Sequence, residues 1–158
     1  MAALDVFQAI EASGVSTAIR ESPWAFAVIE SIHLLALSLM GGAVLLVDLR
    51  ILGIGLTARP VRELAGETER WMTTALVVLI VTGIGLFLSE AVKCFYSTPF
   101  WVKMTTLSLA TIFTYTLRRG VVRKTGTDVG TTTRLVAVVS MALWFTVGAA
   151  GRWIGFSG

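Results

Sequence analysis

The chain has 158 residues, of which 55% are hydrophobic and 15% charged, and its mean hydropathy is +0.80. So much apolar sequence is unusual in a soluble domain and is typical of a bundle of membrane-spanning helices. The net charge is +3, but nine of the thirteen Lys and Arg residues lie in two short loops, which favours membrane orientation over nucleic-acid binding. The single cysteine, Cys94, excludes an internal disulfide and a cysteine-based metal motif.

Residues 1–22 are predicted to lie on the outer membrane surface. They lack the basic start of a cleavable signal peptide, and residues 3–20 are amphipathic, which is typical of an interfacial helix. We expect a break in this helix near Gly14. The length of the chain then fits a single integral membrane domain over residues 1–158.

Four apolar stretches follow, and each is close to the ~20 residues with which a helix crosses a bilayer. They cover residues 24–47, 72–92, 100–117 and 135–155. Because the stretches are continuous and do not alternate with polar residues, they predict helices and not the strands of a barrel. The predicted fold class is therefore all-α, a four-transmembrane-helix bundle with a short N-terminal interfacial helix.

The connecting loops predict the direction of the bundle. Residues 48–70 carry four arginines, and residues 118–134 carry four arginines and a lysine. Both loops lie on one side of a four-span protein, and the positive-inside rule makes that side cytoplasmic. Both termini and the hairpin around residues 93–99 then face the outer side. We expect a bacterial inner-membrane protein in contact with the lipid bilayer, alone, as a homo-oligomer or within a larger membrane complex.

Ionisable residues in the outer halves of the spans are the candidate functional site, because a charge inside the bilayer costs several kcal/mol. Glu30 and His33 share one face of the first helix, and Glu90, Lys103 and Arg152 lie near the outer ends of the other three. At ~1.5 Å per residue, the four charged residues lie about 3–9 Å deep and His33 about 13 Å deep. The prediction is an outer rim of two acids and two bases above His33.

Each predicted helix also has a stripe of polar and small residues that is expected to face the interior. The stripes are Glu30, His33, Leu37, Gly41, Val44 and Asp48; Thr82, Gly83, Leu86 and Glu90; Lys103, Thr106, Ala110 and Thr114; and Met141, Phe145, Gly148 and Arg152. The repeated glycines favour close helix packing over a nucleotide-binding loop, since no complete fingerprint follows a strand.

Haem b fits the predicted cluster. The imidazole of His33 supplies an axial ligand, and Lys103 and Arg152 pair with two propionates. Small residues leave room for the ring, and Trp144 and Phe145 can pack against it. This hypothesis makes the chain an electron-transfer or accessory subunit and not a complete enzyme.

Other interpretations of the cluster remain open. There is no second histidine, so the iron is five-coordinate, uses Met104 or Met141, or takes a ligand from another subunit. Copper bound by His33 and methionines is a second possibility. A cofactor-free transporter, channel or scaffold subunit, with a path through Glu30, His33 and Glu90, is a third.

The same side chains also have purely structural interpretations. Lys103 and Arg152 lie near helix ends, from which long basic side chains extend to the membrane interface. Glu30 and Glu90 can be their ion-pair partners, and a buried histidine such as His33 can serve as a hydrogen-bonding link between helices.

The assembled motifs resemble an uncharacterised family of small bacterial four-helix membrane proteins, a domain of unknown function. The resembling pieces are Pro23-Trp24, Glu30-x-x-His33-Leu34, Gly41-Gly42, Asp48-Leu49-Arg50-x-Leu52-Gly53, Thr82-Gly83, Pro99-Phe100-Trp101-x-Lys103 and Gly151-Arg152. They cover nearly the whole chain. The resemblance implies the four-helix fold and brings little known activity.

A more distant likeness covers three short motifs. A histidine on the first helix, an arginine near the inner end of that helix and a Trp-x-Lys sequence opening the third helix are similar to small four-helix protoporphyrinogen oxidases. Copper-resistance membrane domains are similar in outline. The likeness to the oxidases implies haem b near His33 and a role for Lys103.

Overall fold

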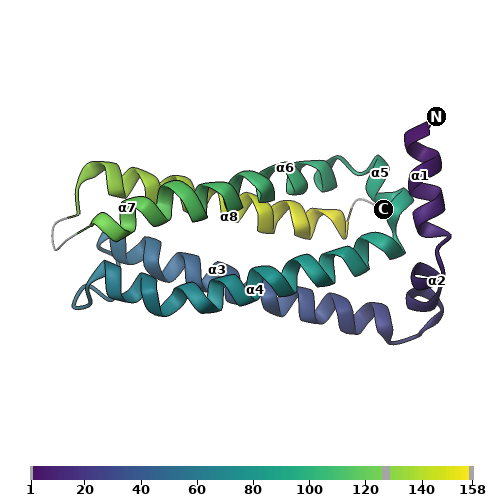
Figure 1. Cartoon of the computed structure of the whole chain (residues 1–158), viewed down its shortest axis with the longest axis horizontal. Coiled ribbons are helices and arrows are strands. Elements are labelled where there is room, and N and C mark those ends of the chain that lie inside the picture. Colours follow the sequence, from purple (N-terminus) through teal and green to yellow (C-terminus); the bar gives the residue numbers. More distant parts are fainter. Residues whose placement is uncertain (1, 126–128, 157–158) are drawn as a thin grey trace.

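The computed structural model describes residues 2–125 and 129–156, and this part of the chain is helical with no β-strand. Four long helical segments run along a common axis, and short helices lie before and between them (Figure 1). In chain order they are α1 (Ala2–Glu11), α2 (Gly14–Glu21), α3 (Ala25–Leu52), α4 (Val61–Ser89), α5 (Ala91–Tyr96), α6 (Thr98–Phe113), the π-helix η1 (Thr114–Arg118), α7 (Arg119–Lys124) and α8 (Thr131–Ile154).

The helices α3, α4 and α8 are each long and apolar enough to cross a bilayer. Their outward faces carry large apolar side chains, such as Leu35, Val81 and Phe145, that would be unfavourable in water. The all-α class and the membrane character that the sequence predicts are therefore confirmed.

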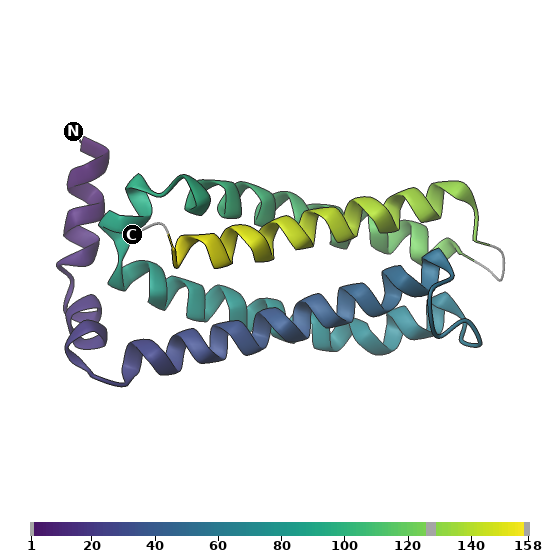
Figure 2. The ribbon, with the colours of Figure 1, turned by 180° about the vertical axis from the view of Figure 1, so that it is seen from behind.

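The long segments form two antiparallel pairs (Figures 1 and 2). Helix α3 packs against α4, α6 packs against α8, and α3 and α8 join the two pairs. Within the described residues, α4 and α6 make no close backbone contact, although α7 approaches α4 at the far end. In the half nearer to α1 the bundle is consequently open at the level of the backbone between α4 and α6, and the stacked rings of Phe87 and Phe100, with centroids 5.7 Å apart, bridge this open side.

The helices extend beyond the predicted apolar stretches at the end that carries the basic residues. Helix α3 continues to Leu52 and α4 begins at Val61. An apolar stretch reports the thickness of hydrocarbon, whereas backbone hydrogen bonding continues into the interface. Gly53 ends α3 in the left-handed region, with φ of +82°, where glycine carries no steric penalty.

The amphipathic N-terminal segment crosses the end of the bundle, as both views show (Figures 1 and 2). The break predicted near Gly14 is confirmed, because α1 ends at Glu11 and α2 begins at Gly14. The ring of Phe7 meets the rings of Phe87 and Phe95 edge-on, with centroids 5.6 and 5.1 Å apart. These contacts hold α1 against the α4–α5 corner.

The inward face of α8 differs from the predicted stripe. Trp144 and Val147 are buried, whereas Phe145 is 78% exposed. Polarity is a poor marker of the inward face in a membrane, because lipid is as favourable a neighbour for Phe145 as the core. The indole of Trp144 turns inward and its Nε1 donates a hydrogen bond to Thr114 Oγ1 at 3.0 Å.

One buried ion pair joins α3 to η1. Arg118 Nε donates to Asp48 Oδ1 at 2.8 Å, and these side chains are only 6% and 0% exposed. Ala110, Thr114, Arg118 and Val122 all face inward at a spacing of four residues. In an uninterrupted α-helix the last of these would be rotated by about 120° from the first. The wider π-turn at Thr114–Arg118 absorbs this rotation and keeps Arg118 facing Asp48.

Replacing Asp48 with alanine leaves the buried guanidinium of Arg118 without its carboxylate. We expect the free energy of unfolding to fall by about 3–5 kcal/mol. Reversible unfolding in mixed micelles, followed by circular dichroism, measures this change. As a control, Glu63→Ala removes an exposed pair with Arg59 and should cost less than about 1 kcal/mol. Equal losses in the two variants would contradict a special role for the buried pair.

Candidate functional site

His33 connects three helices near the α1 end of the bundle. Its imidazole is 7% exposed on α3, with Nδ1 2.8 Å from Thr82 Oγ1 on α4 and Nε2 3.3 Å from Lys103 Nζ on α6. The Thr82 hydroxyl donates to the Val78 carbonyl oxygen at 2.6 Å, so toward His33 it can only accept. Nδ1 therefore carries the proton, and Nε2 accepts from the Lys103 ammonium group.

Two glycines lie against these basic side chains. A Cβ atom on Gly83 would lie 3.3 Å from His33 Cε1, which is closer than an ordinary carbon contact. A Cβ atom on Gly151 of α8 would lie 3.5 Å from Lys103 Nζ. The contact at Gly83 is tighter than an ordinary one, so this glycine admits the His33 ring, whereas the distance at Gly151 is an ordinary van der Waals contact with the Lys103 side chain.

His33 and Lys103 line an apolar groove along the open α4/α6 side of the bundle. The groove has a volume of about 450 Å³. Among the described residues that line it, these two are the only ionisable ones. The other lining residues are Phe7, Leu79, Ile80, Gly83, Ile84, Phe87, Phe100, Trp101, Met104 and Leu107. The groove thus offers two basic groups and one thioether to a ligand that is otherwise apolar.

Of the predicted outer rim, only Lys103 comes close to His33. Glu30 is exposed on α3, and Glu90 Oε2 lies 3.8 Å from Lys93 Nζ. The Arg152 guanidinium lies 4.4 Å above the ring of Phe156. A difference of three residues turns Glu30 about 60° away from His33, and Glu90 has left the helical conformation with φ of −133°. The two acids and Arg152 therefore do not line the groove.

The sequence predicts an inward position for Thr82 but not its hydrogen bond to His33, and it does not predict the pairing of Asp48 with Arg118. A signal for the pair was present. Asp48 directly follows the first predicted span and Arg118 directly follows the third, so an acid and a base lie at the same depth. Opposite charges at one depth of a bundle favour a contact.

Cys94 lies on α5, outside the long helices, and its side chain is buried. Burial, reinforced by the nearby Glu90 carboxylate, raises the pKa of the Cys94 thiol to about 11. The thiol therefore stays protonated at neutral pH, and a protonated thiol is neither a good nucleophile nor a metal ligand.

These features define a helical membrane protein with an apolar groove and a partly buried His–Lys contact. The chain belongs to a family of unknown function (DUF6644), which matches residues 22–157. The predicted membership of an uncharacterised family is thereby confirmed. Searches of characterised proteins and of solved structures give no match.

Replacing Thr82 with valine keeps the shape of the side chain and removes the acceptor for His33 Nδ1. We expect a loss of about 1 kcal/mol in the free energy of unfolding, because hydrogen bonds between membrane helices are modest. The imidazole nitrogen shifts in ¹⁵N NMR should also change. Thr105→Val is the matched control, since the Thr105 hydroxyl contacts only the backbone of its own helix. If NMR shows the same His33 shifts in Thr82→Val as in the unaltered protein, the proposed tautomer is wrong.

Proposed function

We propose that the chain crosses the membrane four times, with residues 98–124 as the span between α4 and α8. Helix α6 alone has 16 residues, but the helical backbone continues without a break through η1 and α7 to Lys124. This run is about 40 Å long, which is more than the ~30 Å of a hydrocarbon core. It also lies antiparallel to α8 along its length (Figure 1).

The proposed orientation places α1, α5 and the end of α8 on the outer side of a bacterial inner membrane. Its support is the concentration of Lys and Arg at the opposite end, in residues 48–70 and 118–134. In this orientation the amphipathic α1 lies in the outer interface, and the groove opens toward lipid in the outer half of the bilayer.

Single cysteines in a Cys94→Ser background test this topology. We expect a membrane-impermeant maleimide to label Thr98→Cys in intact cells. Glu63→Cys and Lys124→Cys, which are equally exposed sites at the other end, should react only after the cells are permeabilised. Labelling of Thr98→Cys and Lys124→Cys from the same side would show that residues 98–124 do not cross the membrane.

We further propose that the groove binds haem b and that the protein serves as an electron-transfer or accessory subunit. The observation that carries this proposal is the presence of the His33 imidazole and the Met104 thioether in the same apolar groove. Histidine and methionine are both axial ligands of haem iron, and an apolar surround suits the porphyrin face. When bound, haem would supply a one-electron redox couple within the membrane.

The surroundings of His33 fit this role. The Nδ1–H bond to Thr82 would leave Nε2 of His33 as the nitrogen that could bind a haem iron, and this hydrogen bond would hold the imidazole in a fixed orientation. Lys103 must move away from Nε2, and its ammonium group then remains in the groove as a partner for a propionate. Arg152 lies outside the groove. Lys103 is therefore the one base that we propose as a propionate partner, where the sequence predicts both Lys103 and Arg152.

The absorption spectrum of protein purified in mild detergent, after expression with ample haem, tests the proposal. We expect a Soret band and a positive pyridine haemochrome assay, and loss of both in His33→Ala. Met104→Leu should shift the Soret maximum or the reduction potential, because the second ligand changes. Lys103→Ala should lower haem occupancy without abolishing the band, since it removes a propionate partner and not an iron ligand.

Arg152→Gln and Glu30→Gln are the matched controls, because both remove a charge at the same end of the bundle outside the groove. They should retain the wild-type haem content. The absence of a Soret band from the unaltered protein, or an unchanged band in His33→Ala, would refute the haem proposal.

A cofactor-free function is the second candidate, and one observation favours it. Lys103, His33, Thr82 and the Val78 carbonyl form a continuous hydrogen-bonded chain across three helices. Such a chain can carry protons or lock the bundle. Proton flux can be measured in proteoliposomes that contain haem-free protein. A flux that is lower in Thr82→Val than in the unaltered protein would favour this candidate over the haem proposal.

Copper handling has weaker support from the groove. Met104 is the single thioether beside His33 among the described lining residues. The described part of the chain also holds no group of three or more His, Cys, Asp or Glu side chains placed to bind a metal. Metal analysis of the same purified samples distinguishes copper from haem iron.

A further inference from the structure

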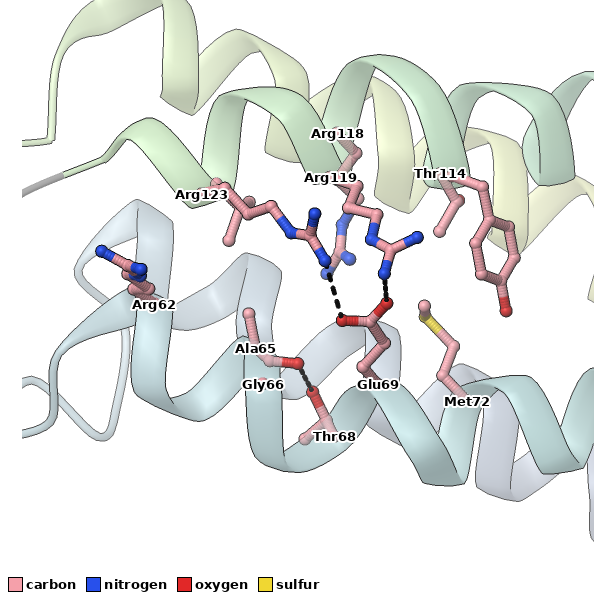
Figure 3. Close-up of a pocket in the computed structure, with 12 residues that line it drawn as sticks. Arg62, Ala65, Gly66, Thr68, Glu69, Met72, Thr114, Arg118, Arg119 and Arg123 are labelled. Atoms are coloured by element: carbon pink, nitrogen blue, oxygen red, sulfur yellow. Dashed lines mark hydrogen bonds and ion pairs between the residues drawn. The ribbon is translucent and has the colours of Figure 1, made fainter.

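A second cavity, which we call the arginine pocket, lies at the opposite end of the bundle and has no part in the proposed function. It lies between the first half of α4 and the η1–α7 segment and has a volume of about 360 Å³. Arg62, Glu69, Arg118, Arg119 and Arg123 are its charged lining residues. Figure 3 shows the side chains of Arg119 and Arg123 directed toward Glu69 on α4.

The arginine pocket has more positive than negative charge. Glu69 is shared between Arg119, whose Nη2 lies 2.5 Å from Oε1, and Arg123, whose Nη2 lies 4.0 Å from Oε2. Arg118 pairs with the carboxylate of Asp48, which lies on α3. Four guanidinium groups therefore have two carboxylates between them, and like charges held this closely repel one another unless an anion is present.

Arg118 also has an unused hydrogen-bond donor. Its side chain is 6% exposed, and its Nη2 is buried without a hydrogen-bond partner among the described residues. The same is true of Arg119 Nε. Buried donors are nearly always satisfied in native proteins, and a charged donor without an acceptor is especially unfavourable. Acceptor oxygens from a bound group would satisfy donors of the pocket.

The backbone at the pocket is unusual as well. The π-turn Thr114–Arg118 forms part of its wall and keeps Arg118 on the inward face. Arg119 follows directly and also lines the cavity, so two adjacent guanidinium groups converge on one space. Single π-turns inside α-helices occur frequently at functional sites, where they direct a side chain that a regular helix would turn away.

We propose that the arginine pocket binds a phosphate group, carried by the headgroup of an anionic lipid or present as free phosphate. Guanidinium groups bind phosphate oxygens in pairs, and several of them can surround one tetrahedral anion. The pocket lies toward the end of the spanning helices, where basic pockets between helices meet lipid headgroups. Phosphate oxygens would neutralise the excess charge and accept from the free donors.

Two probes distinguish the sources of phosphate. Isothermal titration of inorganic phosphate into detergent-purified protein tests the free anion. Native mass spectrometry after reconstitution into phosphatidylcholine nanodiscs that contain phosphatidylglycerol tests the lipid headgroup. We expect one of the probes to bind the unaltered protein saturably. The double variant Arg62→Gln/Arg123→Gln should weaken binding about tenfold for each guanidinium lost, while Arg118 keeps its buried pair.

The control is Arg70→Gln/Arg134→Gln, which removes the same charge from exposed arginines outside the pocket. Its dissociation constant should lie within about twofold of the value for the unaltered protein, because charges outside the pocket attract the probe only through screened electrostatics. Loss of binding in Arg62→Gln/Arg123→Gln but not in the control supports the arginine pocket as the site, and the probe that binds identifies the source of the phosphate. Equal loss in both double variants, or no binding of either probe, overturns the proposal. None of these residues lines the groove, so the haem measurement is independent of the result.

Discussion

The ion pair between Asp48 and Arg118 is the contact on which the arrangement of the two helical pairs depends. Helix α3 packs against α4 and α8, while α6 and η1 lie across the bundle from it. Met40 and Val44 of α3 and Ala110 of α6 belong to one buried core cluster, and two polar contacts also bridge the separation. Arg118 reaches Asp48 at one end, and Lys103 reaches His33 at the other. A charged group in a bilayer has no alternative partner in lipid, so each contact specifies which helices face each other.

The π-turn is what allows both contacts to occur on one continuous helical segment. Lys103 and Arg118 are fifteen positions apart in the sequence, and both face α3. A regular α-helix turns by about 100° per residue, so the two side chains would differ by about 60° in direction. The extra residue per turn at Thr114–Arg118 adjusts this direction. The same adjustment brings Arg118 and Arg119 to the arginine pocket, so the fold and that site share one backbone irregularity.

The membrane helices and the break near Gly14 could be predicted because both depend on local sequence. A continuous apolar stretch has few conformations open to it in lipid. The choice of inward face was less predictable, since lipid and protein core accept the same side chains. Phe145 and Trp144 are neighbours on α8 and both are aromatic, yet the first faces outward and the second packs in the core. The indole N–H of Trp144 requires an acceptor, and Thr114 supplies it from another helix.

The candidate site likewise has features that the sequence predicts and features that depend on packing between helices. The sequence alone predicts that His33 and Lys103 lie in the same half of a helical membrane protein, with His33 the deeper of the two, because depth depends on the position along each apolar stretch. Only the tertiary structure decided that Lys103 reaches His33 while Glu30, Glu90 and Arg152 do not. The physical reason is that rotation about each helix axis, the end of α4 at Ser89 and the open side between α4 and α6 depend on packing between helices. Spacing within a single helix carries no information about those three features.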